Sequence, residues 1–198
     1  MSARRRDWLV LLVLLASTVG LAALAPTDQV LGSGLRIVYL HGTWVWAALL
    51  TFAAAAMTGL VGLILRNDDL VRWSVGLGRS ATVFWLVSLL LSLAAMQTNW
   101  NGLYLDEPRW RVGVRFGVVA VLLQGAGALM RRPRLSSSLN ILFFGLLAAV
   151  LGVTTSVLHP PSPVFSSPST VLRLSFLALL ACTGTSAVWL AQLLRPNA

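Results

Sequence analysis

The sequence predicts an all-α integral membrane protein, a single bundle of six transmembrane helices with both chain termini in the cytoplasm. Of its 198 residues, 57% are apolar and only 11% are charged, whereas a soluble domain carries roughly 25% charged residues. Six apolar stretches approach the roughly 20 residues that a helix needs to cross a bilayer. All fifteen basic residues are arginines, and most fall on one side of the predicted bundle. We expect residues 1–198 to form one domain.

The predicted helices follow these apolar stretches in chain order. The first resembles a signal peptide, because three arginines precede it and Ala23-Leu24-Ala25 ends it. Pro26 directly after the possible cleavage point, and an apolar run longer than the usual length of about 7–15 residues, favour a retained helix instead. The third stretch is short and is expected to extend into its flanks. The six predicted helices cover residues 8–25, 37–65, 80–96, 112–130, 139–158 and 171–194.

The arginines predict the orientation of the bundle. Ten of the fifteen lie before the first helix, after the sixth, or in the connections after the second and fourth helices. An excess of arginine marks the cytoplasmic side of a membrane protein. Residues 26–36, 97–111 and 159–170 are therefore expected outside, in a multi-pass protein of the inner (plasma) membrane. The same distribution indicates that the net charge of +9 reflects orientation in the lipid bilayer and not binding to nucleic acid.

The chain has two histidines, and both are predicted at the outer membrane boundary. His41 lies five residues into the second helix, about 7 Å below its first turn. His159 is expected to close the fifth helix, because Pro160 and Pro161 prevent its continuation. Either histidine alone fits a structural role. Two imidazoles on one face favour the two axial positions of a haem iron.

Other chemistries fit the sequence less well. A structural zinc site usually has four ligands, and no Cys, Asp or Glu is spaced to complete one around either histidine. The G-x-S-x-G motif of a hydrolase is missing from the sequence. The single Cys182 excludes an internal disulfide and a CxxCH site for covalent haem. We therefore expect a non-enzymatic protein that binds haem b non-covalently.

The residues around both histidines resemble the CcmC family, the haem-handling membrane proteins of the cytochrome c assembly (WWD domain) superfamily. The stretch "RIVYLHGTWVW" is similar to the family's Arg-Ile-x-Tyr-x-His pattern, with Trp46 five residues after the histidine. The stretch "LHPPSP" is similar to its second, Leu-His-x-Pro, pattern. Gly42 and Thr43 stand where the family has a proline after the first histidine. The pattern is that of a divergent member.

The loop between the histidines resembles the family's tryptophan-rich outer loop only in part. Trp100 and Arg109 keep the family's residue types, and Tyr104 replaces a second tryptophan by another aromatic ring. The Trp-Asp pair becomes Asp106-Glu107, so the acidic position is kept without its aromatic partner.

The resemblance implies that His41 and His159 ligate haem iron and that residues 97–111 hold the porphyrin. It implies transfer of haem to a haem chaperone or apocytochrome, and ABC-type transporter subunits as partners in a cytochrome c maturation complex. Since the sequence has no P-loop, any ATP dependence would come from such a separate subunit.

The side chains near the outer face suit this ligand chemically. The rings of Trp100, Tyr104 and Trp110 can stack on a macrocycle. The guanidinium groups of Arg36 and Arg109 can pair with its propionates.

Two other function classes remain open. A cytochrome b-type electron-transfer subunit would bury its ligands between helices, and two histidines hold at most one haem. A small transporter or permease subunit without cofactor often has polar groups near the bilayer midplane, whereas the middles of these helices look nearly bare. A bis-histidine haem spectrum would exclude the transporter, and redox cycling with quinol would favour the cytochrome.

Overall fold

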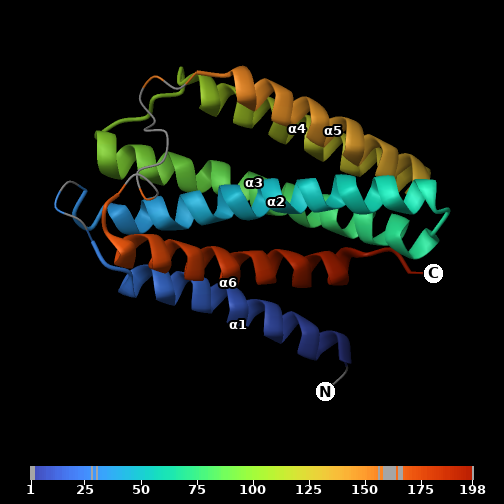
Figure 1. The fold of residues 1–198 in the computed structure, drawn as a ribbon, viewed down its shortest axis with the longest axis horizontal. Helices are drawn as coiled ribbons and strands as arrows, with labels where there is room; N and C mark the ends of the chain where they lie inside the picture. The colour runs from blue at the N-terminus through green and yellow to red at the C-terminus, as the bar shows by residue number, and fades with distance from the viewer. Residues whose placement is uncertain are drawn as a thin grey trace.

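The computed structural model describes residues 3–27, 29, 31–155, 157, 164 and 167–197, with the backbone alone for residues 3 and 4. This part of the chain is all-α and contains no β-strand. Consecutive helices run in opposite directions along the bundle (Figure 1). The helices are α1 (Ala3–Leu24), α2 (Leu35–Ile64), α3 (Asp68–Trp100), α4 (Pro108–Met130), α5 (Pro133–Val153) and α6 (Thr170–Leu194).

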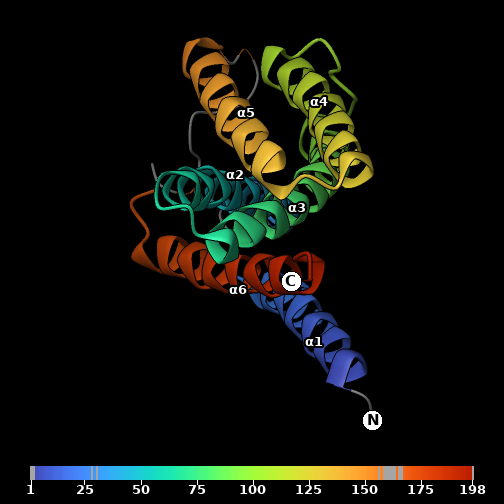
Figure 2. The same ribbon diagram turned by 90° about the vertical axis from the view of Figure 1, so that its right-hand side faces the viewer.

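The helices form three layers. The middle layer is the closely packed pair α2 and α3. On one side lie α4 and α5, and on the other lies α6, with α1 outermost (Figure 1, Figure 2). Among the described helices, α1 contacts only α6 and α2. Both outer layers therefore attach to the α2–α3 pair.

The two ends of the bundle differ in charge. The described termini and the connections at 65–67 and 131–132 lie together at one end, called here the arginine-rich end (Figure 1). There Arg134 of α5 pairs with Asp68 of α3 at 3.0 Å. The connections after α1, α3 and α5 lie at the opposite end, called here the cavity end. The alternation of helices thus separates the arginines in the way that the sequence predicts.

All six predicted helices exist, and each is long and apolar enough to cross a membrane. The third is much longer than the predicted residues 80–96, because a cap starts it at Asp68. The side-chain oxygen of Asn67 accepts hydrogen bonds from the N–H groups of Asp69 at 2.9 Å and Leu70 at 3.2 Å. Acidic residues in a first turn also interact favourably with the helix dipole. Hydropathy alone misses such a polar first turn.

The starts of the fourth and fifth helices also differ from prediction. Pro108 and Pro133 occupy first-turn positions, where proline's missing N–H costs nothing. α4 therefore begins at 108 rather than 112, and α5 at 133 rather than 139. The outer connection predicted at 97–111 shrinks to residues 101–107. The first helix likewise begins at residue 3 rather than 8.

The prediction that His159 closes the fifth helix is wrong. α5 ends at Val153, because Thr154 has extended backbone angles. His159 itself lies outside the described residues.

Aromatic rings fill the contact between the middle layer and the α4–α5 layer. The ring centroid of Phe52 lies 4.8 Å from that of Phe143 and 6.3 Å from that of Trp85. Phe116 lies 5.7 Å from Phe143, ring centroid to ring centroid. Aromatic pairs at these distances add about 0.5–1.5 kcal/mol beyond their buried area. The cluster fixes α4 and α5 beside the cavity, which Trp85 also lines.

A polar network joins the middle layer to α4 and α5 in the half of the bundle nearer the arginine-rich end. The amide nitrogen of Asn140 donates to the carbonyl oxygen of Ser74 at 2.9 Å and to its hydroxyl at 3.2 Å. The amide oxygen of Asn140 accepts from Gln124 at 3.0 Å. Ser74 in turn donates to the carbonyl oxygen of Ala55 at 2.8 Å. Because these polar groups satisfy one another's hydrogen-bonding capacity, the network stabilises the packing of α2, α3, α4 and α5.

Candidate functional site

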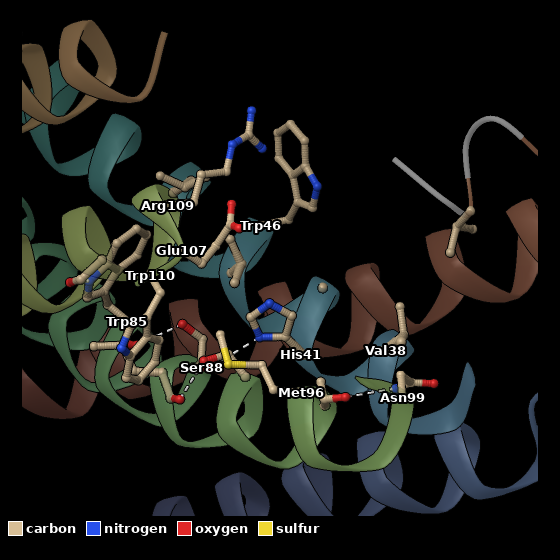
Figure 3. Close-up of a pocket in the computed structure, with 18 of the residues that line it drawn as sticks. Val38, His41, Trp46, Trp85, Ser88, Met96, Asn99, Glu107, Arg109 and Trp110 are labelled. Atoms are coloured by element: carbon tan, nitrogen blue, oxygen red, sulfur yellow. Dashed lines mark hydrogen bonds between the residues drawn. The ribbon is translucent and has the colours of Figure 1, made fainter. Parts of the chain in front are cut away.

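A cavity of about 540 Å³ lies at the cavity end, between α2, α3 and α4 (Figure 3). The cavity is partly open at the protein surface, and its walls are mainly apolar with a few polar groups. Its volume falls in the range of about 300–1,000 Å³ found for small-molecule sites. The lining residues discussed below are His41, Trp46, Trp85, Ser88, Trp100, Glu107, Arg109, Trp110 and Val164.

His41 belongs to α2 and is held by α3. Its ring nitrogen Nδ1 lies 3.1 Å from the backbone carbonyl oxygen of Ser88 (Figure 3). A carbonyl oxygen can only accept, so Nδ1 carries a proton and donates. In the neutral ring, the lone pair is therefore on Nε2, the nitrogen that points away from Ser88. This is the arrangement in which histidine ligands are usually oriented, since the hydrogen bond at one nitrogen fixes the other.

Indole rings line the cavity from three helices. Trp85 of α3 donates through Nε1 to the carbonyl oxygen of Gly113 at 2.9 Å. A Cβ at Gly113 would lie 2.9 Å from a methyl group of Leu89, so glycine permits this close approach of α4 to α3. Trp110 lines the cavity from α4, and Trp46, which is 45% exposed, lines it from α2. These side chains provide broad, rigid and mostly apolar surfaces.

The predicted aromatic loop is divided between a helix end and a turn. Trp100 is the last residue of α3 and lines the cavity. Tyr104 lies in the turn, outside the described cavity lining, with its ring edge-on to Trp100 at 5.9 Å between centroids. Its hydroxyl donates to the carbonyl oxygen of Trp100 at 3.4 Å. Trp100 can touch a molecule in the cavity, and Tyr104 supports Trp100 from outside.

The arginines at this end have different surroundings. Arg109, in the first turn of α4, is exposed and lines the cavity. Arg111 instead forms an ion pair with Asp106. Arg36 is exposed in the first turn of α2 and lies outside the described cavity lining. Its role at a propionate stays a prediction.

The burial and the hydrogen bond of Glu107 are the features of the site that the sequence predicts least well. It directly precedes α4 and is only 4% exposed, and it lines the cavity. Its carboxylate oxygen Oε1 accepts a hydrogen bond from the backbone N–H of Val157 at 3.1 Å. The acidic position in the loop motif was a signal for this residue, but its burial depends on a segment 50 residues further along the chain.

Two described residues flank His159 in the sequence, and both are attached to the cavity. Val157 is held by Glu107. Val164 is 5% exposed, lines the cavity, and belongs to an apolar cluster that includes Tyr39 and Phe176. The described structure brings His41, Trp100 and Arg109 together at one cavity, and His159 lies outside the described residues.

Within the described chain, no group of three His, Cys, Asp or Glu side chains is placed to hold a metal ion. His41 is the residue there that presents an imidazole to the cavity. Neither a scan against protein-family models nor a search of curated proteins gave a match to this chain.

Proposed function

We propose that this protein binds haem b at the outer face of the inner membrane and holds it for delivery to a haem chaperone or apocytochrome. The observation that carries the proposal is the hydrogen bond from His41 Nδ1 to the Ser88 carbonyl oxygen, inside an apolar and indole-lined cavity. It directs a ligand nitrogen at a space suited to a large, flat and apolar molecule.

The walls of the cavity fit the two kinds of surface that haem has. The macrocycle is apolar and aromatic, and the indoles of Trp85, Trp100 and Trp110 offer matching faces and edges. The propionates are anionic, and the exposed guanidinium of Arg109 lies at the same cavity. Arg36 is a second candidate partner for a propionate. Haem would supply an iron ion, and the imidazole of His41 would be one of its ligands.

We propose that His159 would supply the second imidazole ligand. The flanking residues support this proposal, because Val157 is bonded to the cavity-lining Glu107 and Val164 lines the cavity. The Leu-His-x-Pro resemblance points to the same residue. Two imidazoles would give a low-spin iron.

The proposed setting is a bilayer. Six helices of sufficient length and hydropathy indicate a multi-pass membrane protein. We place the arginine-rich end in the cytoplasm, with both termini, and the cavity end outside. A cavity that is partly open at the outer face suits transient holding and release better than electron transfer across the membrane. ABC-type subunits would be supplied by other chains.

The proposal is tested by expressing the full chain in a haem-replete host and recording the absorption spectrum of the purified protein. We expect sharp bands of a low-spin, bis-histidine haem b that acid acetone extracts. A colourless protein that also fails to take up added haemin would refute the proposal and favour a cofactor-free transporter. Rapid reduction by a quinol would instead favour the electron-transfer alternative.

A further inference from the structure

We infer that Glu107 is a positioning residue, whose carboxylate holds Val157 against the start of α4 and thereby would position the second proposed iron ligand. The inference rests on the proposed function, because the ligand concerned is His159. It adds a role for an acidic residue that itself need not touch the iron.

The burial of Glu107 distinguishes it from its acidic neighbour. Its neighbour Asp106 has a side chain that is 92% exposed and pairs with Arg111. Glu107 is only 4% exposed. A carboxylate is costly to bury unless it is hydrogen-bonded, and Val157 N–H provides a charge-assisted hydrogen bond at 3.1 Å.

The backbone of Glu107 is fixed from both sides. Its N–H donates to the carbonyl oxygen of Tyr104 at 3.1 Å, and its carbonyl oxygen accepts from the N–H of Arg111 at 3.0 Å. Among the described residues, its side chain makes no capping hydrogen bond to α4, although it occupies the cap position. The carboxylate thus starts from a rigid backbone and is directed to another segment.

The second attachment of this segment lies on a different wall of the cavity. Val164 packs with residues of α2 and α6, including Tyr39 and Phe176. Its carbonyl oxygen accepts a hydrogen bond from the N–H of Ser167 at 3.3 Å, three residues before α6 begins. Val157 is therefore attached to α4 through Glu107, and Val164 is attached to α2 and α6. Removing the carboxylate releases one of the two attachments.

The experiment compares three variants of the full chain, Glu107→Ala, Glu107→Gln and Asp106→Ala. The first readout is hydrogen exchange at the Val157 amide, resolved by fragmentation mass spectrometry and measured without haem. We expect exchange at least tenfold faster in Glu107→Ala. Glu107→Gln keeps an acceptor oxygen and should retain most of the protection. Asp106→Ala removes the adjacent exposed carboxylate and should match the wild type.

The second readout is the spectrum of each variant loaded with haem. We expect Glu107→Ala to shift part of the haem to high spin and to lose haem faster, and added imidazole to restore the low-spin bands. Glu107→Gln and Asp106→Ala should keep the wild-type spectrum. Unchanged exchange in peptides from α2 and α3 would show that the bundle is intact.

Wild-type exchange at Val157 in Glu107→Ala would overturn the inference, as would faster exchange with an unchanged haem spectrum. A wild-type protein that binds no haem would refute the proposed function and the ligand-setting role with it. In that case, the exchange readout separately decides whether Glu107 holds Val157.

Discussion

The imidazole of His41 on α2 is fixed by the backbone of Ser88 on α3, with 3.1 Å between Nδ1 and the carbonyl oxygen. The two helices that form the middle layer thus also set the ring nitrogen that a metal would meet. A backbone carbonyl cannot be removed by substitution, so the orientation of the ring is a property of the helix packing. Predictions about the site therefore concern the ring itself, the walls of the cavity and the frame that holds them.

The orientation of the bundle is tested by cysteine labelling in a Cys182→Ser background. Leu103 is exposed at the cavity end and Asn197 is exposed beside the C-terminus. We expect Leu103→Cys to react with an impermeant thiol reagent on intact cells, and Asn197→Cys to react only after lysis. The opposite pattern would place the cavity in the cytoplasm and contradict delivery at the outer face.

The aromatic wall is tested by Trp100→Ala. Since Trp100 lines the cavity, its removal should weaken haem binding by about 1 kcal/mol, or about fivefold in Kd, without changing the spin state. Tyr104→Ala should have a smaller effect, because Tyr104 only supports Trp100. Trp8→Ala, near the arginine-rich end, is the control. Equal haem affinity in all three variants would assign Trp100 to packing or lipid contact.

The propionate assignment is tested by Arg109→Ala, with Arg111→Ala as the neighbouring control. An exposed ion pair stabilises by about 1 kcal/mol or less, so we expect up to about fivefold weaker haem binding for Arg109→Ala alone. An iron porphyrin with esterified propionates should bind both variants equally. If Arg109→Ala also weakens binding of the esterified porphyrin, Arg109 acts through packing and not through a propionate.

The polar network is tested by Asn140→Ala. This change removes two donated hydrogen bonds and the acceptor of Gln124, so we expect a loss of about 1–3 kcal/mol in the free energy of unfolding. Denaturant titration in detergent measures it. The haem spectrum should not change, because Asn140 lies outside the described cavity lining. A changed spectrum at full occupancy would connect the network to the site.

The number of helices follows from hydropathy, because each crossing needs one long apolar stretch. The ends of the helices do not follow from hydropathy, since polar caps and prolines determine where these helices begin. Asn67 starts α3 well before its apolar stretch, and Pro133 does the same for α5. The end of α5 at Val153 has no clear sequence signal, because the proline pair begins seven residues beyond it.

Part of the site was predictable from helix geometry. His41 was identifiable as the one histidine within an apolar stretch. Arg36 lies five residues earlier, which is about 140° around the helix, and helix geometry therefore accounts for its place outside the described cavity lining. The burial of Glu107 was not predictable, because it depends on the N–H of Val157. No local sequence pattern at Glu107 or Val157 predicts this contact.

The proposed function depends most on ligation of haem iron by His41 through the nitrogen opposite Ser88. The most direct measurement is the absorption and electron paramagnetic resonance spectrum of His41→Ala loaded with haemin, recorded without and with imidazole. We predict high-spin iron or loss of haem without imidazole, and low-spin iron once imidazole fills the vacated position. His159→Ala should behave alike, and the double variant should retain little haem. A wild-type low-spin spectrum at full occupancy in His41→Ala would contradict the account.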